Sequence, residues 1–395
     1  MNFFVGAGSR YETDEEAGIS HFVEHLCFKG TEKRPTSVDI CTVIEGVGGM
    51  LNAGTDKEMT VYYCKVAQPH FHDALDVMAD ILINSKFDAA EIEKERQVIV
   101  EEINMSLDFP AARVSLLVDE LLWPGHALGR DIAGSRESVS TMTRDMMMAY
   151  LAERYQPDNV VLSIAGDIDE AEVAGTVNRM TAGWTGSRLR TSFDPYGGEG
   201  GRSVRIENRD TEQTQLCLAL PGVGMNHPDR FKLDMLNVIL GEGMSSRLFA
   251  EIRDNLGLAY SIHSYAEHFL DTGAMTVSAG VETKNLGTAV RAILEQMALL
   301  KDDVPEAELT KAKELFKGRM WLRMEDSRSV AGWAGAQEIL TGKIQSVDEI
   351  IETVEAITTG ELRDVASRLF TGDQLRLAVV GPVDPDAPLE DLLKL

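Results

Sequence analysis

The spacing of apolar and polar residues predicts a series of strands and helices in the first half of the chain. Residues 49–66 alternate between apolar and polar side chains, as expected for two strands. Residues 71–84 and 88–107 instead repeat their apolar positions every three or four residues, which indicates two long helices. The apolar run at 159–169 ends in a glycine and a turn, which is typical of a strand end.

The second half of the chain repeats this series. Residues 258–281 have the character of strands, and two helical segments follow at 284–300 and 305–324. The run at 374–384 then matches the strand and turn that close the first half. Such self-similarity at long range indicates that the chain contains an internal repeat.

This pattern predicts an α+β fold with two homologous α/β-roll domains, each an antiparallel-rich sheet packed with helices and related by the internal repeat. Glycine, proline and serine are in excess at 187–203, where both the helical and the strand periods are lost. We therefore expect an N-terminal domain over 1–188, a linker over 189–203 and a C-terminal domain over 204–395.

The strongest chemical signal lies at residues 21–25, which read His-Phe-Val-Glu-His. Side chains four positions apart lie roughly 40° from each other around a helix, so His21 and His25 share one face and Glu24 points to its neighbouring side. The positions around the histidines are apolar, namely Ile19, Phe22, Val23, Leu26 and Phe28. A helix that is apolar on most sides is expected to be buried. Buried imidazoles and a buried carboxylate need partners, and a metal ion would supply one.

The order His-x-x-Glu-His is the inverzincin arrangement of a zinc site. Two imidazoles and a distant carboxylate leave a fourth coordination position open, and a carboxylate beside that position can act as a base. A pattern with three fixed positions is short, however. The alternative is a solvated helix face that carries two titratable histidines.

A second helix is expected over residues 89–104, with Asp88 as its N-cap and Glu91 completing the capping pattern. On a helical projection Glu95 and Glu102 fall about 20° from each other. The same side of this helix carries an apolar stripe: Ile92, Val98, Ile99, Ile103 and Met105.

A carboxylate in a core-facing stripe is costly unless it is paired or bound to a metal. We take Glu102 as the third metal ligand and Glu95 as a helper carboxylate that orients the site. The alternative is a buried ion pair with Arg113 or Arg130.

Composition and charge narrow the classes of function. The chain has 395 residues, of which 44% are hydrophobic, and a formal net charge of −26, which disfavours nucleic acid and anionic membranes as partners. The sequence has neither an apolar run long enough for a membrane span nor the features of a signal peptide. The chain has four irregularly spaced cysteines, Cys27, Cys41, Cys64 and Cys217. This pattern forms no disulfide framework and suits a reducing compartment, so we expect a cytoplasmic protein.

Three separated motifs, in order along the chain, resemble the M16 metallopeptidases, the family of pitrilysin, insulin-degrading enzyme and mitochondrial processing peptidase. They are GAGSRYETDEEAGISHFVEHLCFKGTEKRP, EKERQVIVEEI and GMSSRLFAEIRDNLGLAYS. The short, two-domain length is similar to the bacterial, processing-peptidase-like branch (M16B). The resemblance implies one zinc ion per chain held by His21, His25 and Glu102, with Glu24 as general base and Glu95 as the helper glutamate.

The resemblance also implies substrate-contacting residues outside the metal site. Arg253 and Tyr260 match an arginine and a tyrosine that contact the substrate or its transition state. Judged from the residues alone, Arg253 would form a surface salt bridge and Tyr260 would be a core aromatic. Asn52 and Ala53 match an edge strand that pairs with the extended backbone of the substrate.

The activity implied by the resemblance is zinc-dependent hydrolysis of unfolded peptides by an endopeptidase or oligopeptidase, inside a chamber formed by two such chains. We expect a homodimer, with a heterodimer as the other arrangement. The alternative function is a non-catalytic or regulatory subunit of a processing-peptidase-like heterodimer. Family chains also carry further residues before VGAGSRYE that form the first strands of the sheet, so we expect either a start upstream of Met1 or a missing edge strand.

Overall fold

The computed structural model describes residues 1–186, 193–198 and 203–395, and its contacts divide the chain into two units. The first unit consists of Met1–Met105, Arg130–Asp194 and Leu322–Ile344. The second unit consists of Ser106–Gly129, Pro195–Trp321 and Gln345–Leu395. Most of the predicted linker at 189–203 lies outside the described residues, so the division of the sequence at that point stays a prediction.

The first unit is built on a four-stranded antiparallel sheet in the order β2-β3-β1-β4. Its strands are β1 (Asn2–Val5), β2 (Met50–Thr55), β3 (Thr60–Lys65) and β4 (Val160–Ser163). Its helices are α1 (Ile19–Cys27), α2 (Ser37–Glu45), α3 (Phe71–Ile83), α4 (Ala89–Asp108, shared at its end with the second unit), α6 (Arg136–Thr141), α7 (Arg144–Arg154), α8 (Glu170–Met180) and α12 (Ser327–Thr341). Short 3₁₀ turns connect them at η1 (Ser9–Tyr11), η2 (Gln68–His70) and η4 (Pro157–Asn159).

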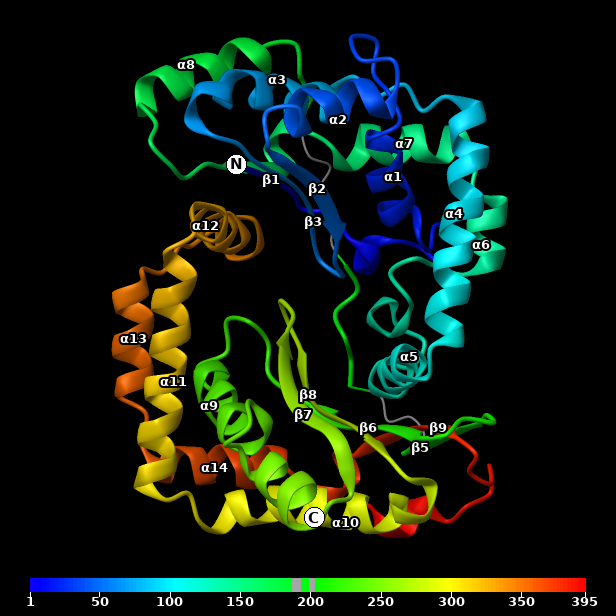
Figure 1. Ribbon diagram of the computed structural model, residues 1–395, viewed down its shortest axis with the longest axis vertical. Coiled ribbons are helices and arrows are strands. Elements are labelled where there is room, and N and C mark those ends of the chain that lie inside the picture. The colour runs from blue at the N-terminus through cyan, green and yellow to red at the C-terminus, as the bar shows by residue number, and fades with distance from the viewer. Residues whose placement is uncertain (187–192, 199–202) are drawn as a thin grey trace. The chain divides into compact units, whose positions relative to one another are not determined.

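Helices cover both faces of this sheet. The central strand β1 is buried along its whole length, and consecutive residues Phe3 and Phe4 are each 2% exposed although they point to opposite faces. Figure 1 shows α2 and α3 on one side of the sheet and α12 on the other. Helix α12 comes so close that a Cβ added to Gly335 would lie 2.2 Å from the ring of Phe4.

The second unit is built on a five-stranded sheet in the order β5-β9-β6-β8-β7. Its strands are β5 (Val204–Asn208), β6 (Thr214–Pro221), β7 (Ala259–His268), β8 (Gly273–Val281) and β9 (Arg376–Gly381). Its helices are α5 (Pro110–Leu122), α9 (Arg230–Gly241), α10 (Leu286–Asp302), α11 (Glu306–Met324, shared at its end with the first unit), α13 (Val347–Glu355) and α14 (Thr359–Leu369). Further short turns are η3 (Ala127–Gly129), the π-helix η5 (Phe249–Asn255), η6 (Thr283–Asn285), η7 (Gly372–Gln374) and η8 (Leu389–Leu392).

The two sheets confirm the predicted repeat. Read from one edge, the order β4-β1-β3-β2 of the first sheet is repeated as β9-β6-β8-β7 in the second, with the same order of strands along the chain. The second sheet has one further strand, β5, which runs parallel to β9. The α+β class is therefore confirmed, and the four long predicted helices are present as α3, α4, α10 and α11.

Each unit also contains a helix from the other half of the sequence. Helix α5 belongs to the first half, yet it packs on β6 and β9 of the second sheet through a core that includes Leu117, Trp123 and Ala378. Helix α12 belongs to the second half, yet it packs on β1 and β4 of the first sheet. Among the described residues, no helix combines the length and the apolar character needed to cross a membrane.

Candidate metal centre

Helix α1 carries both histidines of the predicted site, and its first turn is tightly fixed. Gly18 has a φ of +94°, and a Cβ there would lie 2.5 Å from the carbonyl oxygen of Ala133. The carboxylate of Glu12 accepts hydrogen bonds from the backbone N–H groups of Gly18 and Ser20, each at 2.8 Å. A carboxylate at a helix N-terminus satisfies free amide groups and interacts favourably with the helix dipole.

Helix α4 supplies the carboxylates. Asp88 caps its first turn by accepting from the N–H of Ala90 at 2.9 Å, as the sequence predicts. The buried guanidinium of Arg96 donates to the carbonyl oxygens of Val139 and, at 2.8 Å, Met142, which anchors α4 within the first unit. Both histidines and both predicted carboxylates therefore lie on elements of one unit.

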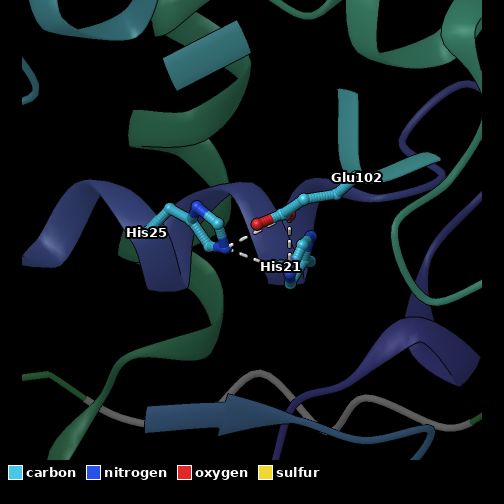
Figure 2. A group of neighbouring side chains, drawn as sticks. All are labelled: His21, His25 and Glu102. Atoms are coloured by element: carbon cyan, nitrogen blue, oxygen red, sulfur yellow. Dashed lines mark hydrogen bonds and ion pairs between the residues drawn. The ribbon is translucent and has the colours of Figure 1, made fainter. Parts of the chain in front are cut away.

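The three predicted ligands converge, as Figure 2 shows. Nε2 of His21 and Nε2 of His25 lie 3.1 Å apart, and Oε2 of Glu102 lies 3.8 Å from the first nitrogen and 3.7 Å from the second. Two atoms bound to one tetrahedral zinc ion at about 2.0–2.1 Å lie roughly 3.3 Å from each other. The donor atoms and their separations therefore fit a zinc ion closely.

The charges of the two imidazoles also suit a metal. Burial, together with the neighbouring charge of His25, lowers the pKa of His21 to about 4, so His21 is neutral near neutral pH. Burial lowers the pKa of His25 as well, but the hydrogen bond to Glu95 and the charges of Glu102 and Glu24 raise it overall. The negative charges of Glu95, Glu102 and Glu24 favour a positive charge at His25. A metal cation bound to the imidazole would supply that charge in place of a proton.

Glu95 lies behind His25, as predicted, and has a partner that the sequence did not reveal. Its Oε1 lies 2.8 Å from Nδ1 of His25, while its Oε2 lies 2.6 Å from Nζ of Lys29. The alternative of a buried ion pair is correct in kind for Glu95, which pairs with Lys29, but its suggested partners are wrong. Arg113 pairs with Glu207 and Arg130 pairs with Asp14. The four-residue spacing was the available signal, since His25 lies in the last turn of α1 and Lys29 lies two residues beyond its end.

Glu24, the predicted base, is 8% exposed and accepts a hydrogen bond from Oγ1 of Thr55 at 2.7 Å. Burial raises the pKa of Glu24 above its ordinary value, although the bond from Thr55 acts in the opposite direction. Thr55 was also missed from the sequence. It lies at the end of β2, close in the chain to the predicted substrate-binding residues Asn52 and Ala53.

The apolar stripe predicted on α4 is correct for three of its five residues. Ile92, Ile99 and Ile103 are buried, but Val98 is 44% and Met105 is 66% exposed. On a helical projection the three isoleucines lie to one side of Glu95, roughly 40–80° away, whereas Val98 and Met105 lie roughly 60–80° away on the other side. Glu102 falls on that second, open flank, and its side chain is 38% exposed. The predicted ligand therefore lies where the buried side of α4 meets its exposed flank.

Three of the remaining predicted residues lie on edge strands, and the fourth, Arg253, lies on a short helix. Asn52 and Ala53 are on β2, which among the described residues pairs only with β3, so the predicted edge position is confirmed. Arg253 lies on η5 and Tyr260 on β7 of the second unit, and the guanidinium carbon is 5.1 Å from the Tyr260 ring centroid. Tyr260 is 78% exposed, so the alternative of a core aromatic is wrong.

Comparison with known proteins gives a consistent family. Residues 1–136 match the profile described as Insulinase (Peptidase family M16), and residues 141–316 match the profile described as Peptidase M16 inactive domain. The chain is 36% identical over 383 residues to the uncharacterized zinc protease YmxG of Bacillus subtilis, covering 97% of this chain and 92% of that protein. It is 37% identical over 394 residues to the uncharacterized zinc protease Rv2782c of Mycobacterium tuberculosis, with coverage of 97% and 88%.

Solved structures agree in fold. A protease from Helicobacter pylori superposes with a TM-score of 0.89 at 22% identity, covering 96% of this chain and 93% of that one. An M16-like peptidase from Alicyclobacillus acidocaldarius superposes with a TM-score of 0.83 at 19% identity, covering 96% and 92%. At these identities the likeness shows the two-domain fold.

Proposed function

The chain belongs to peptidase family M16, and on that premise we propose that it is a zinc-dependent endopeptidase that hydrolyses unfolded peptides. One observation carries the proposal: the donor atoms of His21, His25 and Glu102 converge at zinc-like separations while the carboxylate of Glu24 lies beside them. The relatives are named uncharacterized zinc proteases, and these names support the choice of metal.

In this proposal His21, His25 and Glu102 hold one zinc ion per chain. A zinc ion held there would supply Lewis-acid chemistry, lowering the pKa of a water molecule and polarising the peptide carbonyl group. Glu24 is the residue that would take up the proton of the attacking water and deliver it to the leaving amine. Thr55 holds Glu24 in place through its hydrogen bond, and the buried position of Glu24 raises its pKa, which suits a group that must both take up and release a proton.

The other predicted residues act on orientation and binding. Glu95 orients His25 through the bond to Nδ1, so that Nε2 is free to bind the metal. Arg253 and Tyr260 hold the peptide backbone or the developing oxyanion. The edge strand β2, through Asn52 and Ala53, pairs with the extended peptide by strand addition.

We further propose that two copies of the chain form a homodimer that encloses the peptide, and that the protein is cytoplasmic. The buried, free thiols of Cys27, Cys64 and Cys217 support a reducing compartment. Size-exclusion chromatography with light scattering tests the first statement, since a monomeric chain with full activity would contradict it.

The second candidate is a non-catalytic subunit of a processing-peptidase-like heterodimer. The observation that favours it is the match of residues 141–316 to a profile described as an inactive domain. The proposed ligands, however, all lie within residues 1–136, which match the other profile. A peptidase needs only one metal centre per pair of halves, so an inactive second half is compatible with an active chain.

The test is hydrolysis of a quenched-fluorescent peptide library by the wild-type chain and by Glu24→Gln, with zinc content measured on both proteins. We expect the wild type to cleave, and Glu24→Gln to keep its zinc but to lose most turnover because the base is gone. Cleavage at wild-type rate by Glu24→Gln would refute the assignment of the base. If both proteins bind zinc but neither cleaves a peptide when assayed without a partner chain, the result would favour the non-catalytic subunit.

A further inference from the structure

The carboxylate of Glu95 is held at both of its oxygens. Oε1 faces Nδ1 of His25 at 2.8 Å, and Oε2 faces the ammonium group of Lys29 at 2.6 Å. The Glu95 side chain is 6% exposed, so water competes little for either oxygen. The last torsion of a glutamate is intrinsically broad, and two fixed partners define the carboxylate plane where one partner would leave it free to turn.

Lys29 stands on a rigid segment of backbone. Its N–H donates to the carbonyl oxygen of Leu26 at 3.1 Å, which continues the last turn of α1. The next residue, Gly30, has a φ of +131°, and a Cβ there would lie 2.3 Å from the carbonyl oxygen of Pro35. The carbonyl oxygen of Gly30 also accepts from the N–H of Lys86 at 3.1 Å. The lysine side chain therefore starts from a fixed point and ends on Glu95.

The two imidazoles of the candidate centre are anchored differently. His25 has Nδ1 bound to Glu95, which fixes its tautomer and directs Nε2 towards His21 and Glu102. Within the described part of the chain, the buried Nδ1 of His21 has no hydrogen-bond partner. The orientation of the ligand set consequently depends on the chain of contacts from Lys29 through Glu95 to His25.

We propose that Lys29 is a positioning residue of the metal centre, which sets the plane of the Glu95 carboxylate and through it the orientation of His25. This inference rests on the proposed zinc site but not on peptide cleavage. The lysine acts through Glu95 and touches neither the ligand atoms nor the substrate.

The experiment measures the zinc affinity of the full chain by competition with a chromogenic chelator, without peptide. Removal of such an outer partner typically weakens metal binding by about 10–100-fold, and we expect roughly tenfold for Lys29→Met. Lys29→Arg keeps the charge and the donors, so it should restore most of the affinity. The matched control is Lys94→Met, because Lys94 neighbours Glu95 on α4 but is 69% exposed and pairs with Glu91.

A double-mutant cycle separates positioning from a general structural role. Lys29→Met should add no further loss of affinity in a Glu95→Gln background, since its effect passes through Glu95. Lys29→Met should also reduce the rise in Tm that zinc produces, whereas a purely structural role would lower the Tm of zinc-free and zinc-loaded protein equally. Wild-type affinity in Lys29→Met, or an equal loss in both backgrounds, would overturn the proposal.

The outcomes also separate this inference from the proposed function. If the wild type binds zinc more tightly than Lys29→Met but cuts no peptide, the positioning role is supported and the peptidase is refuted. A wild-type chain that binds no zinc would overturn both. Circular dichroism of each variant confirms that the fold is retained before the affinities are compared.

Discussion

Glu12 is a buried carboxyl group at the start of the helix that carries both histidines. It is 6% exposed, and its two oxygens accept from the amides of Gly18 and Ser20. Burial raises the pKa of Glu12 to about 7 from its ordinary value of 4.5, although the hydrogen bonds to the amides and the charge of Arg130 act to lower it. Helix α1 therefore begins on a group that changes its charge close to neutral pH.

The shift in the pKa of Glu12 predicts a pH-dependent stability. Between pH 4.5 and about 7 the folded chain holds the Glu12 proton while the unfolded chain has released it, so the free energy of unfolding falls as the pH rises. A difference of about 2.5 pH units at 1.36 kcal/mol per unit corresponds to roughly 3 kcal/mol. This contribution is fully present below pH 4.5 and fully lost above about pH 7.

The perturbation is Glu12→Gln, which keeps the shape of the side chain but does not titrate. Urea unfolding of the variant and the wild type, followed by circular dichroism between about pH 5 and pH 8, gives the difference in stability at each pH. We expect the variant to gain roughly 3 kcal/mol relative to the wild type across this range. Glu15→Gln, at an exposed neighbouring carboxylate, controls for the loss of one negative charge. A Glu12→Gln difference that is the same at every pH would refute the reasoning.

Three further predictions follow from other contacts. Thr55→Val removes a charge-assisted hydrogen bond to Glu24 of about 1.5–3 kcal/mol, so kcat/KM on a cleaved peptide should fall at least tenfold, while Thr55→Ser should keep most activity. Glu102→Ala removes one of three donors, so the zinc content measured by emission spectrometry should fall well below one ion per chain. Gly335→Ala places a Cβ 2.2 Å from the buried ring of Phe4, and calorimetry should show a loss of about 1–3 kcal/mol.

Each of these predictions has a contradicting result. Equal activities of Thr55→Val and Thr55→Ser would mean that the hydroxyl group does not support the base. Full zinc content in Glu102→Ala would mean that Glu102 is not the third ligand. An unchanged or higher Tm in Gly335→Ala would mean that the contact between α12 and β1 relaxes without cost.

The sequence brought together the three residues that converge in the structure because the spacing of the histidines is local and their distant partner lies on a strongly periodic helix. His21 and His25 needed only the helical period, and Glu102 was placed on α4 by the neighbouring isoleucines. The extent of the buried stripe was wrong, since Val98 and Met105 have apolar side chains but lie on the open flank of α4. The helical period gives the direction in which each side chain points, but it does not show whether another element of the fold covers that side chain.

The contacts that support Glu24 and Glu95 could not be predicted from the sequence, for a different reason. Thr55 has no distinguishing sequence signal, and the spacing of Lys29 from His25 places the lysine near the site without identifying Glu95 as its partner. Only the tertiary fold brings Thr55 to Glu24 and Lys29 to Glu95. The roles of the predicted linker and of Arg253 stay predictions, because they depend on how distant parts of the chain cooperate.

The exchange of helices between the halves has a consequence for synthesis on the ribosome. Residues of the first sheet emerge early, but α12, which covers one of its faces, is translated only near the end of the chain. Until then the apolar face around Phe4 lacks its cover, and a nascent chain in that state is a natural client for chaperones. A chain terminated before Ser327 would carry every proposed zinc ligand and still present an unfinished sheet to cellular quality control.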